Sequence, residues 1–161
     1  MLKRTVLQLS AAVALLALSA CATAPAPTTI TDTVARTPQL STLSRLLAQA
    51  GLAEALQGAG PFTLFAPTDE AFKAVPAATM TQLANDKTML RSVLSYHVVP
   101  GKLTSADIKN GPAKTLQGAN VQLSKSGTFV TVEDAVVQTA DIQATNGVVH
   151  IIDRVLIPPK Q

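Results

Sequence analysis

The stretch that decides the fold is Asn146-Gly147-Val148-Val149-His150-Ile151-Ile152-Asp153-Arg154-Val155-Leu156-Ile157-Pro158-Pro159. Asn-Gly is the dipeptide best suited to the positive φ angles of a tight hairpin turn. The five residues that follow are strand formers without polar alternation, and such a strand needs cover on both faces. Asp153-Arg154 interrupts the run, 155–157 resumes it, and two prolines end it. The pattern predicts a central strand that the rest of the chain must bury.

Length and composition predict one domain with appendages. The 161 residues are 47% apolar but only 3% aromatic, which indicates an aliphatic core. The formal charge of +3 falls to +1 without Lys3 and Arg4, which lie in a segment expected to be removed. Because nucleic-acid binding needs clustered Lys and Arg, this charge balance excludes it.

The N-terminus has the pattern of a secretion signal. Lys3-Arg4 precedes the apolar residues 5–18, a stretch shorter than the ~20 residues of a membrane span. Residues 18–21, Leu-Ser-Ala-Cys, resemble the bacterial lipobox, which implies that Cys21 becomes the new N-terminus and carries a diacylglycerol and an N-acyl chain. The alternative is an ordinary cleavable signal with an incidental cysteine. The residue after Cys21 is Ala22 and not an aspartate. By resemblance to the sorting rules of enterobacterial lipoproteins, this favours the outer membrane.

Three segments follow from these patterns. We expect residues 1–20 to be a lipoprotein signal peptide and residues 38–159 to be the folded domain. Between them, residues 21–37 hold the lipidated cysteine and an Ala/Thr/Pro-rich stretch without periodicity. Such a composition is typical of an extended, semi-stiff spacer.

Within the domain, helical patterns come first and strand patterns later. Helices are predicted at 41–50, 52–57, 69–75, 77–84 and 87–95, with a helical turn at 104–109. Strands are predicted at 62–65, 96–99, 121–123, 128–132, 135–137 and 147–157. Thr68 and Asp86 are candidate N-caps, and Asp69 places negative charge in a first helical turn. This order favours an α+β fold with an antiparallel or mixed sheet.

Three segments also resemble the signatures of one known family. Thr63-Leu64-Phe65-Ala66-Pro67-Thr68-Asp69-Glu70-Ala71-Phe72 is similar to the first fasciclin signature. Leu94-Ser95-Tyr96-His97-Val98-Val99-Pro100-Gly101 is similar to the tyrosine-histidine motif, and 146–159 to the second signature. The chain therefore resembles a fasciclin-like domain (the beta-Ig-H3/fasciclin family) in a bacterial lipoprotein. The resemblance implies a wedge-shaped β-sandwich with several short helices packed on it, used for adhesion rather than catalysis.

The resemblance also implies where a partner would bind. Animal matrix relatives use the region of the tyrosine-histidine motif, here Tyr96 and His97, and an aspartate-isoleucine element, here Asp141 and Ile142. The Glu, Pro and Met that flank that element are absent here, so we do not carry integrin binding over. The loop after Pro100 offers further candidate contacts. They include Lys102 and Asp107.

The residues provide no pattern for catalysis, a metal or a cofactor. Two histidines 53 positions apart match no zinc spacing, and no Gly-x-Ser-x-Gly turn is present. His97 could contact a ligand or respond to pH, but a buried neutral histidine bonded to backbone or carboxylate is the favoured interpretation for it and for His150. A structural role is likewise expected for another group of residues: Thr68, Asp69, Asn146, Gly147 and His150.

Two functions remain open. The first is a non-catalytic adhesion module, a monomeric domain held at the membrane by the acylated Cys21, whose partner is an unidentified protein or polysaccharide. The alternative is a periplasmic lipoprotein that binds a small hydrophobic or lipid ligand in a crevice between helices and sheet. Because ligand sites are typically concave and apolar, a sizeable closed cavity would favour this alternative.

Overall fold

The computed structural model of the chain describes residues 28–159. Cys21, the signal sequence and the first part of the spacer lie outside the described residues. Within 28–159, no helix combines the length and the apolar character that crossing a membrane requires.

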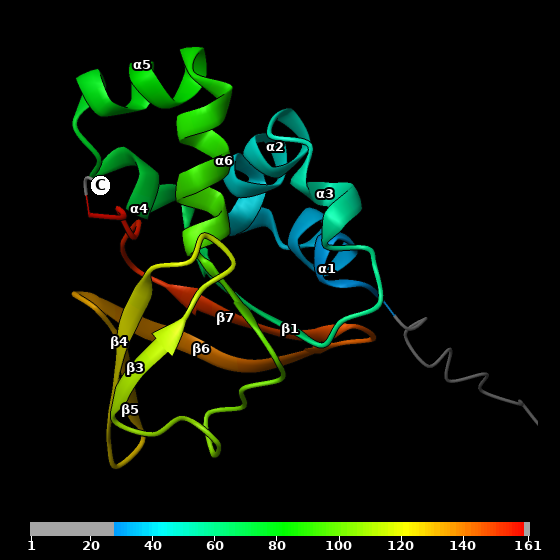
Figure 1. The fold of residues 1–161 in the computed structure, drawn as a ribbon, viewed down its shortest axis with the longest axis vertical. Helices are drawn as coiled ribbons and strands as arrows, with labels where there is room; N and C mark the ends of the chain where they lie inside the picture. The colour runs from blue at the N-terminus through cyan, green and yellow to red at the C-terminus, as the bar shows by residue number, and fades with distance from the viewer. Residues whose placement is uncertain (1–27, 160–161) are drawn as a thin grey trace, which may run out of the picture.

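The described chain alternates little between helix and strand: the helices come first and the sheet is completed late (Figure 1). The helices are α1 (Ile30–Arg36), η1 (Pro38–Leu40), α2 (Ser41–Gln49), α3 (Leu52–Ala55), α4 (Asp69–Lys73), α5 (Ala77–Asn85) and α6 (Lys87–Tyr96). The strands are β1 (Phe62–Pro67), β2 (Val98–Pro100), β3 (Gly111–Lys114), β4 (Asn120–Ser126), β5 (Phe129–Val132), β6 (Ala135–Ala144) and β7 (Gly147–Ile152).

The sheet has the order β2-β1-β7-β6-β5-β4-β3, and β7 lies at its centre. β7 pairs parallel with β1, from Phe62 opposite Gly147 to Pro67 opposite Ile152, and antiparallel with β6. All six residues of β7 are buried. The predicted central strand is therefore confirmed, and so is the α+β class with a mixed sheet.

Two apolar clusters cover the two faces of the central strands. Alternate residues of a strand point to opposite faces; accordingly Val149 and Ile151 pack under the helices, whereas Ile152 packs on the other face with Phe65. Figure 1 shows the helices gathered over β1 and β7 on one side, with β3, β4 and β5 extending beyond them. The sheet also curls, so that the residues after β3 come near β2. The Leu116 N–H donates to the Val98 carbonyl at 2.8 Å across this approach.

The folded region begins before residue 38, the boundary expected from composition. Thr29 and Asp32 form a reciprocal capping box that starts α1. The side chains of Ile30 and Val34 are fully buried in the cluster under the helices. Because α1 contributes to the core, the second half of the expected spacer belongs to the domain.

Other predicted elements differ in extent. The strand predicted at 96–99 is shorter, because α6 continues to Tyr96 and β2 begins only at Val98. The helical turn predicted at 104–109 is a hydrogen-bonded turn in which the Ile108 N–H reaches the Thr104 carbonyl at 3.0 Å. The strand predicted to resume at 155–157 does not form. Just before this range, Asp153 exchanges hydrogen bonds with the backbone of Val136, and the chain then continues as an irregular segment.

Candidate functional site

His97 joins the end of α6 to the C-terminal segment. Its ring is fully buried, and Nδ1–H donates to the Val93 carbonyl at 2.8 Å. Nε2 accepts the Leu156 N–H at 2.9 Å. A carbonyl can only accept and an N–H can only donate, so these two partners fix one neutral tautomer. His97 thus holds together residues that are 59 positions apart in the chain.

Burial lowers the pKa of His97 to about 4, outweighing the hydrogen bond to Val93, which acts to raise it. The physical reason is that a charged imidazolium loses its hydration in the apolar core. A second ring proton would also point at the Leu156 N–H, where an acceptor is required. His97 is therefore neutral at physiological pH and supports the fold.

Tyr96 occupies the last position of α6, and its side chain is only 3% exposed. Its hydroxyl lies 3.0 Å from the Asn120 carbonyl and 3.3 Å from Oε1 of Glu133. Burial, together with the nearby Glu133 carboxylate, raises the pKa of Tyr96. The polar atoms of Tyr96 and His97 are thus engaged by groups of the protein itself, while Tyr96 also lines a hollow beside the C-terminal segment.

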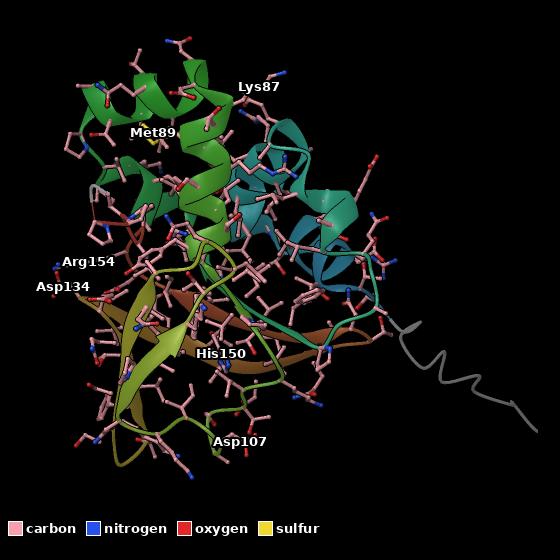
Figure 2. The ribbon with its side chains drawn as sticks, viewed as in Figure 1. Lys87, Met89, Asp107, Asp134, His150 and Arg154 are labelled. Atoms are coloured by element: carbon pink, nitrogen blue, oxygen red, sulfur yellow. The ribbon has the colours of Figure 1, made fainter. Side chains whose placement is uncertain are left out.

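His150 plays a comparable role on β7 (Figure 2). Its ring stacks on Phe65 with 5.5 Å between centroids. Nε2–H donates to the Leu103 carbonyl at 2.7 Å, and Nδ1 accepts the Asp141 N–H at 3.3 Å. This tautomer is the opposite of that of His97, and burial lowers the pKa of His150 as well. His150 therefore connects the central strand to the loop that follows β2.

Asp141 holds the same loop from the other side. It lies at an irregularity of β6, between the pairs of Thr139 and Ile142, with a φ of 60°. Its carboxylate accepts the Ser105 N–H at 2.6 Å and also the Ser105 hydroxyl. Burial acts to raise the pKa of Asp141, but the Ser105 hydrogen bonds outweigh it and the pKa lies below its usual value. Asp141 fixes a turn, and its carboxylate is already occupied.

Asn146 and Gly147 connect three segments at the start of β7. The Asn146 Oδ1 accepts the Ile30 N–H at 2.9 Å, and Nδ2 donates to the Leu56 carbonyl. Gly147 is the first residue of β7, so the β6–β7 turn is centred on Thr145-Asn146 and not on Asn146-Gly147 as expected. A Cβ on Gly147 would lie 1.8 Å from the Phe62 carbonyl oxygen. Close approach of β1, not the turn, requires glycine here.

Thr68 and Asp69 are neighbours in the chain but stabilise the starts of two different helices. The Thr68 hydroxyl accepts the Ala71 N–H at 3.2 Å and caps α4. Asp69 instead reaches across to α2, where it accepts the Thr42 N–H at 2.8 Å and the Ser41 hydroxyl at 2.7 Å. The pKa of Asp69 is lowered because these bonds outweigh the effect of burial.

The remaining predicted contacts lie apart. Lys102 and Asp107 are exposed on the loop between β2 and β3, whereas Ile142 is half-buried against the cluster under the helices. In residues 28–159, no three His, Cys, Asp or Glu side chains gather in a way that could hold a metal ion. Every buried side-chain nitrogen and oxygen in this range has a hydrogen-bond partner. The predicted residues therefore do not form one continuous site: Tyr96, His97 and His150 are buried, whereas Lys102 and Asp107 are exposed.

Sequence reasoning did not identify the exposed face of β4 and β5. Phe129 on β5 is 71% exposed, the most exposed of the large apolar side chains in the described region. The signal was present in the alternation of Gln122, Ser124 and Ser126 with buried residues, which shows which side of the strand meets solvent.

Residues 38–158 match the family model of the Fasciclin domain. The chain belongs to the fasciclin domain family. The match covers the first two signature segments, the last one up to residue 158, and all of the described elements from η1 onward.

Similar proteins extend this assignment. "Protein sll1483" of Synechocystis sp. is 43% identical over 133 residues, which cover 81% of this chain and 74% of the relative. "Cell surface glycolipoprotein MPB83" of Mycobacterium bovis is 38% identical over 129 residues, 77% of this chain but only 58% of the relative. Among solved structures, a FAS1 domain pair from the insect cell adhesion molecule Fasciclin I superposes with a TM-score of 0.64 at 17% identity. That superposition covers 81% of this chain and 51% of the insect chain, and it supports the fold alone.

Proposed function

We propose that this chain is an exported, non-catalytic binding module, tethered to the bacterial envelope by acyl chains on Cys21 and used for adhesion. The observation that carries the proposal is the family membership of residues 38–158 together with the lipobox-like sequence ahead of them. The name of MPB83 describes a relative that is itself a lipoprotein of the cell surface. Two or more acyl chains anchor a protein stably, whereas one alone binds only marginally.

The use of the polar residues supports a binding role. General acid-base catalysis needs a titratable side chain within reach of a substrate. Here His97 and His150 are fully buried, and each uses both ring nitrogens to bond backbone groups. One nitrogen of each ring reaches a distant segment, at Leu156 for His97 and at Leu103 for His150. His97 and His150 thus stabilise the fold. We expect the exposed strands and loops to contact a partner.

The alternative, a hydrophobic ligand held between helices and sheet, finds no specific support. That interface is filled by aliphatic side chains, among them Leu43, Leu47 and Leu94, each at most 2% exposed. A hollow of about 490 Å³ lies elsewhere, beside the C-terminal segment. Its lining mixes the charged side chains of Glu133, Asp134 and Arg154 with apolar residues such as Leu156 and Ile157. A binding surface fits this arrangement better than an apolar cavity does.

The anchoring part is tested by Cys21→Ala in the full chain, expressed with its own signal sequence. We expect the wild type in the detergent-soluble membrane fraction, with an acylated N-terminal peptide in mass spectra, and the variant in the soluble fraction. Separating inner from outer membranes on a density gradient tests the expected outer-membrane location. A Cys21→Ala protein that still sediments with membranes would refute lipid anchoring.

The binding part is tested separately, with the full-length protein immobilised in detergent and exposed to envelope and surface-polymer extracts. We expect specific retention of a protein or polysaccharide, competed by soluble extract. Equal retention by the heat-unfolded protein would show that the folded domain provides no binding surface.

A further inference from the structure

We infer that the exposed face of β3, β4 and β5, continued by one residue of β6, binds a neutral polysaccharide; this inference deepens the proposed adhesive function and rests on it. The residues that form this surface, called here the β4–β5 face, are Pro112, Lys114, Asn120, Gln122, Ser124, Ser126, Phe129, Thr131 and Val136.

Strand register places these side chains on one side of the sheet. Residues directly opposite in an antiparallel pair point to the same face. Pro112 pairs with Gln122, Ser124 with Thr131, and Ser126 with Phe129. Thr131 pairs in turn with Val136. Of the nine residues only Thr131 is half-buried; the rest are exposed, because the helices cover β1 and β7 but not this end of the sheet (Figure 1).

The β4–β5 face carries almost no charge. Lys114, at one corner, is the single charged side chain of the nine. Glu133 borders the face, and its carboxylate accepts the Gln122 N–H at 2.8 Å and the Tyr96 hydroxyl at 3.3 Å. Lys125, the other lysine of this hairpin, points to the opposite face and donates from Nζ to the Ser105 carbonyl at 2.6 Å. An anionic polymer or a nucleic acid would require clustered Lys and Arg, so the matching partner is uncharged.

The polar side chains that β4 contributes to the face are free to bind. Asn120, Gln122, Ser124 and Ser126 form one row on β4, about 20 Å long at ~3.4 Å per residue. Within residues 28–159 the side chains of these four make no hydrogen bond, and only their backbone groups do. Amides and hydroxyls both donate and accept, which suits the hydroxyl groups of a sugar chain.

Phe129 supplies the apolar contact at the end of this row. The face of a phenyl ring is electron-rich, and it attracts the C–H groups that a pyranose ring presents on its own face. A protein partner would favour a different composition, because protein–protein hot spots are rich in Trp, Tyr and Arg and poor in Ser and Thr. One exposed ring beside hydroxyls and amides therefore points to a neutral glycan.

The test uses the full-length protein in detergent and four insoluble neutral matrices: cellulose, chitin, a β-1,3-glucan and cross-linked dextran. Alginate beads supply the anionic comparison. We expect retention on at least one neutral matrix and none on alginate. Phe129→Ala should weaken that retention roughly tenfold or more, since an aromatic residue that anchors a contact is typically that costly to lose. The double variant with Gln122→Ala and Ser124→Ala should weaken it as well.

The matched control is Ile157→Ala, which truncates another exposed apolar side chain, 54% exposed, outside the face. It should bind like the wild type, and all variants should keep the wild-type melting temperature. Retention on alginate alone, wild-type binding by Phe129→Ala, or a dimer that Phe129→Ala dissociates would each overturn the inference. A protein that ignores every neutral matrix yet still retains envelope protein would overturn it while leaving the proposed adhesive function intact.

Discussion

Mild acid should destabilise this domain through its buried histidines, and His97 allows the effect to be calculated. Its pKa is about 4 in the folded protein and 6.5 in its usual environment. The unfolded chain therefore binds a proton more readily between these two values. The contribution of neutral His97 to stability is fully present above pH 6.5 and is lost progressively as the pH falls towards 4. For this pKa difference the loss from pH 7.5 to pH 5 is about 2 kcal/mol.

The assay is urea unfolding followed by circular dichroism at intervals from pH 7.5 to pH 5, with free energies from linear extrapolation. The lowered pKa of His150 adds a loss of the same sign. The carboxylates with lowered pKa values, such as Asp69 and Asp141, destabilise the fold only as the pH falls below about 4, because their usual value is 3.8. The interval above pH 5 therefore isolates the histidines.

The control is His97→Gln, which cannot titrate and offers an amide that can accept the Leu156 N–H. We expect it to be less stable than wild type by about 1–2 kcal/mol at pH 7.5, because the Val93 carbonyl loses its donor. Its stability should then fall less steeply with acid, with the slope due to His150 remaining. A wild-type free energy that stays constant between pH 7.5 and pH 5 would refute the reasoning, as would an unchanged slope in His97→Gln.

Three further substitutions test the connections of β7. Gly147→Ala should cost about 3 kcal/mol or more in urea unfolding, because the new methyl would overlap the Phe62 carbonyl; Gly127→Ala, with open space around it, should cost only about 1 kcal/mol, and similar costs for both would contradict the close-approach argument. Asn146→Ala should cost about 2–3 kcal/mol by losing the bonds to Ile30 and Leu56, and Asn146→Asp should regain only part, since it keeps the acceptor alone; full recovery in the aspartate variant would show that the Leu56 bond contributes nothing. Asp141→Asn keeps a residue that tolerates positive φ but removes one acceptor, so hydrogen exchange of the Ser105 amide should quicken about tenfold, and unchanged protection would count against the role of Asp141.

Local signals in the sequence predicted the elements that depend on local physics. The caps at Thr68 and Asp86 are short-range hydrogen bonds, so the residue types were enough to place them. The unbroken apolar run of β7 identified a strand with two covered faces. The three signature segments supplied the family, whereas the order of helices and strands came from the local patterns.

The misses concern contacts between distant segments or surroundings of unusual composition. α1 was hidden in a Thr- and Pro-rich stretch, although the Thr29-to-Asp32 capping box was readable there. The tautomers of His97 and His150 depend on Leu156 and Leu103, which no spacing rule connects to them. Asp69 was expected to serve its own helix, yet its partners belong to α2, because only the packed fold brings the two helices together.

The central place of β7 also governs when the chain can fold. The strand that separates β1 from β6 is β7, and in the register that pairs Phe62 with Gly147 its parallel partner β1 lies 85 positions earlier. Without β7, β1 and β6 have no strand between them, and each of the two apolar clusters lacks the side chains that β7 contributes. Such long-range pairing makes folding slow and late. The domain should therefore stay unfolded until β7 is available to pair with β1 and β6.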